Sequence, residues 1–155
     1  MKNSTQKNIK GLSIAILIIT TLYLIFIYGT TVNQLWVRKS VVWNPDHLAW
    51  QYFVIAGWLI GATLLYVFCW IFLVRTNRSL QNGDIFPKSN IALIRWTALV
   101  TVLATFVQSN YEDAIHGAHC SVLDSNTFFF PLAVLLFAAL YKMAYLTAKD
   151  SRLAI

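Results

Sequence analysis

Side chains that commonly bind transition metals gather in one polar stretch of the sequence, NYEDAIHGAHCSVLDSN. They are Glu112, His116, His119 and Cys120. If a helix continues through this stretch, the spacing places the carboxylate, the first imidazole and one of the two later ligands on one face. Carboxylate, imidazole and thiolate groups bind zinc or copper, and imidazole and thiolate also bind haem iron. The stretch is therefore a candidate metal or haem site.

The opposing interpretation is a polar loop whose histidines bind nothing. Gly117 disfavours the helix that would align the ligands. The stretch also lacks a repeated Cys-x-x-Cys and a His-Glu-x-x-His pattern. Asp113 and Asp124 add negative charge without any Lys or Arg, which attracts cations in either case. We expect no cofactor and retain zinc, copper or haem as the alternative.

The composition places these side chains in a membrane protein. The chain has 155 residues, enough for one domain, of which 58% are apolar and 12% charged, whereas globular proteins average about 45–50% and about 25%. Because so few polar residues cannot cover a water-exposed surface, lipid is the expected solvent. The net charge of +6 comes from residues scattered between apolar stretches, without a basic run. Direct binding of nucleic acid is therefore not expected.

Four apolar stretches are long enough to cross a hydrocarbon core about 30 Å thick, which takes about 20 helical residues. Backbone groups cannot remain unpaired in lipid, so each stretch should be a helix. The first is too long for the core of a cleavable signal peptide, so we expect it to be retained. We predict one integral membrane domain over 1–155, an all-α, up-down-up-down four-helix transmembrane bundle. Its predicted spans are 11–31, 49–74, 91–111 and 128–146.

Local signals mark two of the helix starts. Asn44 can cap the second helix, and Pro45 suits its first turn, where the N–H that proline lacks has no intrahelical partner anyway. Asn82-Gly83 is a turn pair between the second and third spans. Pro87 is expected to open the third helix in the same way as Pro45 opens the second.

The basic residues set the expected orientation, because cytoplasmic flanks of membrane helices are enriched in Lys and Arg. One side of the predicted bundle consists of both termini and the loop at 75–90. That side holds ten cations, and the other side holds only Arg38 and Lys39. We therefore place both termini and the loop in the cytoplasm. The ten are Lys2, Lys7, Lys10, Arg75, Arg78, Lys88, Arg95, Lys142, Lys149 and Arg152.

Two small residues mark a packing face in the second span. Gly57 and Gly61 form a Gly-x-x-x-Gly step, which permits two helix backbones to approach closely. Packing against another helix of the same chain is the favoured interpretation. A second copy of the chain, and hence a homo-oligomer, is the alternative.

Transport and thiol chemistry have little support in the sequence. Transporters usually keep ionisable residues near the bilayer midplane, and the centres of the four spans have none. Cys69 and Cys120 are predicted on opposite sides of the bundle, more than about 20 Å apart, which excludes a disulfide between them. The polar groups that remain are hydroxyls, which commonly bond to their own helix: Thr20, Thr21, Thr63, Thr101 and Thr105.

The loop RSLQNGDIFPKSNIALIR joins the second and third spans and carries a recognisable pattern. It consists of a leucine, NGDIF, an asparagine and an aliphatic-Arg step that enters an apolar helix. In these features the chain resembles the YoaS-like family of bacterial membrane proteins, grouped as domain of unknown function 2975. The resemblance implies the bacterial cytoplasmic membrane and no established activity. The matching positions are Leu80, Gly83, Phe86, Asn90 and Arg95.

Some members of that family look to be encoded beside a small helix-turn-helix regulator, which suggests a membrane partner for a transcription factor. The residues alone allow two readings of the loop. In one, Gly83 permits a positive-φ turn, while Phe86 and Asn90 hold the loop against the helix ends. In the other, the loop is a docking site for a cytoplasmic protein.

Three functions follow, in order of preference. The first is a non-enzymatic accessory or regulatory protein that acts on a cytoplasmic partner through loop 75–90. The second is a metal- or haem-binding membrane subunit that uses the outer loop at 110–127. The third is a small solute permease.

Overall fold

The computed structural model describes residues 2–82, 86–119 and 123–153, with side chains described for 7–82, 86–119, 123–125 and 127–150. The described parts of the chain are helical with short connections. Four helices are long: α1 (Lys2–Val32), α2 (Leu48–Gln81), α3 (Ser89–Ser109) and α5 (Asn126–Leu153). A short helix, α4 (Tyr111–Ile115), follows α3. A π-helical turn (Asn33–Val37) extends α1, and a 3-10 turn (Pro45–His47) precedes α2.

All four long helices are apolar and long enough to cross a membrane. The predicted all-α class with four such helices is confirmed. The helices extend beyond the predicted spans at most ends: α2 continues to Gln81 and α5 to Leu153, whereas α3 ends at Ser109 instead of residue 111.

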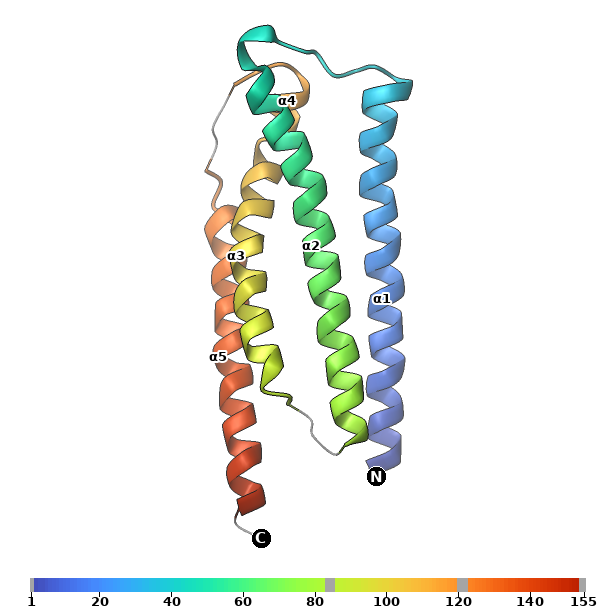
Figure 1. The fold of residues 1–155 in the computed structure, drawn as a ribbon, viewed down its shortest axis with the longest axis vertical. Helices are drawn as coiled ribbons and strands as arrows, with labels where there is room; N and C mark the ends of the chain where they lie inside the picture. Colours follow the sequence, from blue (N-terminus) through green and yellow to red (C-terminus); the bar gives the residue numbers. More distant parts are fainter. Residues whose placement is uncertain (1, 83–85, 120–122, 154–155) are drawn as a thin grey trace.

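The long helices alternate in direction and form an open row (Figure 1). Backbone contacts join α1 to α2, α2 to α3, and α3 to α5, but within the described residues the α1 backbone does not come close to α3 or α5. The helix α3 packs against both α2 and α5. Of its apolar window 44% is buried within the protein, against 11% for α1 and 11% for α2. Most of the apolar surface of α1 is therefore left for lipid or another partner.

The helices α2 and α3 approach closely at the two glycines of the Gly-x-x-x-Gly step. A Cβ atom built on Gly61 would lie 3.2 Å from the Cβ and 3.3 Å from the Cα of Ala104. A Cβ atom on Gly57 would lie 3.0 Å from Cγ1 of Val107. Both glycines therefore face α3 of the same chain, and the absence of side chains there is what lets the two backbones meet.

Hydroxyl pairs join α1 to α2. Thr21 Oγ1 and Tyr66 Oη are 3.1 Å apart, and Tyr28 Oη and Thr63 Oγ1 are 2.8 Å apart. Both threonines also donate to carbonyls of their own helices, so each tyrosine hydroxyl is the donor in its pair. These bonds fix the rotation of a helix that has few packing contacts.

The start of α1, the end of α2, the start of α3 and the end of α5 lie together, at the bottom of Figure 1. We call this the terminal end, and the opposite end, with residues 33–47, α4, 116–119 and 123–125, the distal end. Every cation with a described side chain is exposed. At the terminal end these are Lys7, Lys10, Arg75, Arg78, Lys88, Arg95, Lys142 and Lys149.

The two prolines predicted at helix starts each lie in a short turn that leads into the helix. Asn44 accepts the Asp46 N–H at 3.1 Å, and Pro45 is the first residue of the turn that leads into α2, as predicted. Pro87 lies two residues before α3, which begins at Ser89. The Pro87 carbonyl accepts the Asn90 N–H at 3.0 Å, in a turn that leads into the helix.

Candidate functional site

A buried asparagine joins three helices at the terminal end. Asn90 has no exposed surface. Its Nδ2 donates to Thr76 Oγ1 of α2 at 3.0 Å and to Tyr141 Oη of α5 at 3.3 Å. Thr76 Oγ1 in turn donates to the Phe72 carbonyl at 2.8 Å. The amide was expected to bond exposed helix-end groups, and the structure instead pairs it with side chains of two neighbouring helices.

Aromatic rings surround this polar contact. Tyr141 lies edge-on to Phe86, with ring centroids 5.4 Å apart and planes at 86°, and its hydroxyl donates to the Pro87 carbonyl at 3.5 Å. Phe72 and Phe137 contact the same tyrosine at 5.9 and 6.2 Å. Phe86 therefore holds the connection between α2 and α3 against α5.

The other signature positions differ in their surroundings. Leu80 is buried at the end of α2, and Arg95 is exposed on α3. Gly83 lies outside the described residues. Asn90 and Phe86 thus face the protein interior. The exposed residues described in the 75–90 segment are three cations and three neutral polar residues: Arg75, Arg78, Lys88, Gln81, Asn82 and Ser89.

Within the described residues, Glu112, His116 and His119 do not form a group of three metal-binding side chains. A continuous helix through 112–119 was the condition for their alignment, and α4 ends at Ile115. Gly117 then takes φ +79°, a left-handed conformation that terminates the helix. His116 Nδ1 lies 2.7 Å from the Glu112 carbonyl instead of from its carboxylate. Within the described residues no three metal-binding side chains converge, and Cys120 lies outside them.

His119 has a different neighbour. Its ring centroid is 4.9 Å from that of His47, with the planes at 31°, and 5.1 Å from Trp50, which it meets edge-on. The two histidines come from separate connections, one before α2 and one after α4. His119 is exposed and His47 is half-buried.

Gln51 positions the two connections that carry these histidines. Its side chain is completely buried in α2. Its Nε2 donates to the Val42 carbonyl at 2.8 Å and to the Ala114 carbonyl at 2.6 Å, and its Oε1 accepts the Asn44 N–H at 2.9 Å. One amide therefore bonds three backbone groups, at Val42, Asn44 and Ala114.

Direct bonds between the two connections add to this arrangement. The Val42 N–H donates to the Ile115 carbonyl at 2.9 Å, and Asn44 Nδ2 donates to the Gly117 carbonyl at 3.1 Å. A Cβ atom at residue 117 would lie 3.0 Å from the Val42 carbonyl oxygen. Gly117 is thus required both by its φ angle and by this close approach.

Tyr111 links the distal end to α1. Its hydroxyl donates to Gln34 Oε1 at 2.7 Å and lies 3.4 Å from Thr31 Oγ1. Thr31 is almost fully buried. At the distal end, side-chain hydrogen bonds therefore connect α4 to both α1 and α2.

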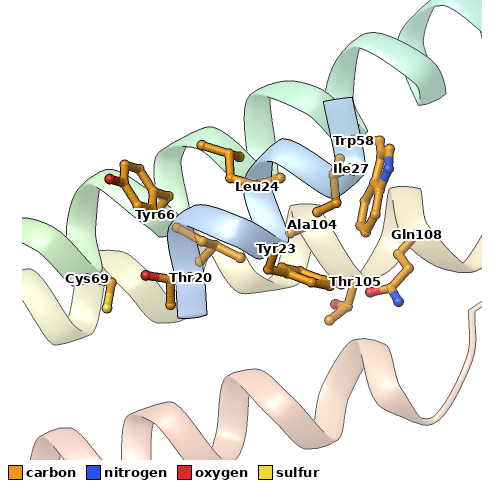
Figure 2. Close-up of a pocket in the computed structure, with 12 residues that line it drawn as sticks. Thr20, Tyr23, Leu24, Ile27, Trp58, Tyr66, Cys69, Ala104, Thr105 and Gln108 are labelled. Carbon is orange, nitrogen blue, oxygen red and sulfur yellow. The ribbon is translucent and has the colours of Figure 1, made fainter. Parts of the chain in front are cut away.

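A cavity of about 210 Å³ lies between α1, α2 and α3, and Figure 2 shows its lining. Tyr23, Trp58 and Gln108 line one part, and Tyr66 and Cys69 line the other. The lining contains aromatic, hydroxyl, amide and thiol groups but no Asp, Glu, Lys, Arg or His. Tyr23 and Gln108 are exposed, so the cavity opens beside them.

The threonines that a solute path would need are mostly occupied. Thr20 and Thr105 line the cavity, and both donate to carbonyls of their own helices. Thr101 does the same, and Thr21 and Thr63 also bridge α1 and α2. These hydroxyl groups therefore form hydrogen bonds within the helices or between α1 and α2, and the bonds within the helices were expected from the sequence.

Fold and sites together define a small, all-helical protein with four helices able to cross a membrane, tied by polar contacts at both ends. Comparison with protein families, with curated proteins and with solved structures finds no match.

Three residues that organise these sites were not predicted from the sequence. Tyr141 reads as one of many aromatic residues in an apolar helix, and only the fold brings it to Asn90. His47 lies far from His119 in the chain, so no local spacing relates them. Gln51 had a usable signal, since a glutamine near the start of an apolar span needs a hydrogen-bond partner.

Proposed function

We propose that the chain is a small, non-enzymatic accessory or regulatory protein of the bacterial cytoplasmic membrane, with the terminal end in the cytoplasm. It acts by binding an acidic surface of a cytoplasmic protein partner. Four membrane-length helices support the membrane location. The resemblance of loop 78–95 to the YoaS-like family supports the bacterial setting.

The observation that carries the proposal is the gathering of exposed cations at the terminal end. Arg75, Arg78, Lys88 and Arg95 are all exposed there on α2, α3 and the segment between them. Opposite charge steers association and sets orientation more than it adds affinity. A cationic end therefore favours an acidic partner and a reversible, salt-sensitive complex.

The inward position of Asn90 and Phe86 changes how the loop would act. Because Asn90 is fully buried and Phe86 packs on Tyr141, neither side chain is available to a partner. Their role in the proposal is to hold α2, α3 and α5 in register, so that the cations stand at fixed positions.

Site-specific photo-crosslinking in intact cells tests the proposal. A photoreactive residue replaces Lys88, and the same residue at Arg38, an exposed cation of the distal end, serves as control. We expect a discrete adduct with a soluble protein from position 88 and none from position 38. The adduct should be lost in R75E/R78E and kept in R75K/R78K. An adduct that survives charge reversal, or one formed only at position 38, contradicts the proposal.

The second candidate function, a metal-binding membrane subunit, is supported by a different observation. It is the contact between His47 and His119, whose ring centroids are 4.9 Å apart. Its ligand set differs from the predicted one.

A further inference from the structure

Two histidines from different connections meet at the distal end, on a surface that the proposed function leaves without a role. We propose that His47 and His119 together bind a divalent transition metal, copper(II) before zinc. Each supplies one neutral imidazole nitrogen, and water fills the remaining positions. The inference is independent of the acidic partner at the terminal end.

The distance between the two rings suits a shared metal. An imidazole nitrogen binds zinc at about 2.0–2.1 Å, so the metal lies about 3.2 Å from the ring centroid. Two such rings are about 4.5 Å apart at a right angle around the metal and about 5.2 Å apart at the tetrahedral angle. The observed separation of 4.9 Å lies between these values.

The protein holds the two ligands in place before any metal binds. The connection with His47 is joined to the one with His119 by the bonds of Val42 with Ile115 and of Asn44 with Gly117. Gln51 bonds the first connection at Val42 and α4 at Ala114, just before the second connection. Trp50 packs edge-on against His119 at 5.1 Å. A ligand pair that is already positioned loses less entropy on binding.

The charge of the distal end also favours a cation. Asp46, next to His47 in sequence, and Glu112 are exposed there and Asp113 and Asp124 are half-exposed, against the two exposed cations Arg38 and Lys39. Two imidazoles and water suit copper(II), which binds nitrogen ligands more tightly than the other divalent metals of the first transition row. This higher affinity is the reason for naming copper(II) before zinc.

The His116 side chain provides a matched control. It is exposed, lies in the same connection as His119, and has its Nδ1 atom 2.7 Å from the Glu112 carbonyl. The predicted set of Glu112, His116 and His119 would make His116 a ligand, whereas the pair proposed here leaves it out.

The test titrates copper(II) chloride into the full chain, purified without a histidine tag in detergent micelles. We expect one copper per chain, with nitrogen hyperfine structure from two imidazoles in the electron paramagnetic resonance spectrum. Binding should quench the fluorescence of Trp50, so W50F should lose the largest part of the quenching. H47Q and H119Q should each weaken binding at least about tenfold, whereas H116Q should leave it unchanged.

Two results would overturn the inference: copper affinity in H47Q/H119Q equal to that of the unsubstituted chain, or an equal loss in H116Q. Thermal unfolding of each variant shows whether it is folded. Because His119 is exposed, H119Q keeps the buried contacts of the distal end. That variant decides the outcome alone if H47Q proves unstable.

Discussion

Single polar side chains determine how the ends of this protein are built. Asn90 at the terminal end and Gln51 at the distal end are both fully buried, and each bonds groups from more than one segment. A buried amide is stable only where its partners are in place. Each of these residues therefore disfavours helix rotations that would break its bonds to the neighbouring segments, although Asn90 Oδ1 is buried without a hydrogen-bond partner.

We predict that Asn90→Ala destabilises the protein by about 1–3 kcal/mol. The substitution removes the bonds to Thr76 and Tyr141 and leaves a space between three helices. Thermal or denaturant unfolding in detergent measures the change. Asn82→Ala is the control, because the Asn82 side chain is exposed. Its free energy of unfolding should lie within about 0.5 kcal/mol of that of the unsubstituted protein. If the two variants had equal free energies of unfolding, the proposed structural role of Asn90 would be wrong.

The candidate sites show what spacing along the chain can and cannot predict. Asn90 and Phe86 were singled out from one loop, but their partner Tyr141 is on another helix. Glu112, His116 and His119 were grouped by helical spacing, and the grouping fails because Gly117 ends the helix. His119 pairs with His47 only because α2 and α4 lie side by side. Contacts between distant segments depend on tertiary structure, which no local pattern contains.

At the scale of helices, the sequence was more informative. Length and hydrophobicity predicted four long helices, since lipid forces each apolar stretch to satisfy its own backbone. The small residues Gly57 and Gly61 also pointed to a packing face, and that face meets α3. The sequence did not indicate the open row, because exposed and buried positions in a membrane helix are both apolar and give little periodicity.

Substitution of alanine for single glycines tests the close contact between α2 and α3. Gly61→Ala should destabilise the protein by about 1–3 kcal/mol through overpacking, because the new methyl group would meet the Ala104 backbone. Gly57→Ala should cost less, because its nearest neighbour is a methyl group of Val107. Unfolding in detergent measures which of the two variants loses more stability.

Gly29→Ala is the control for both variants. No atom lies within 4 Å of a Cβ built at that position, so the change should be neutral or favour the helix by up to about 1 kcal/mol. If Gly61→Ala were as stable as Gly29→Ala, the two helices would not depend on the close approach.

At the scale of the whole molecule, the two ends differ in charge. Among the described side chains, the terminal end has eight cations and Asp150, whereas the distal end has Arg38 and Lys39 with Asp46, Glu112, Asp113 and Asp124. The same asymmetry sets the proposed orientation and gives each end its proposed partner. A cationic end attracts an acidic protein, and an anionic end attracts a metal ion.

The proposed orientation predicts the activity of topology reporters. Alkaline phosphatase is active only outside the cytoplasm, so a fusion after Ile155 should be inactive and one after Ala118 should be active. Green fluorescent protein, which folds in the cytoplasm, should give the opposite pattern. A fusion after Gln81 should match the one after Ile155, because the ends of α2 and α5 lie together (Figure 1). An active phosphatase after Ile155 would place the cations outside, and both the acidic cytoplasmic partner and the external copper site would then have to exchange compartments.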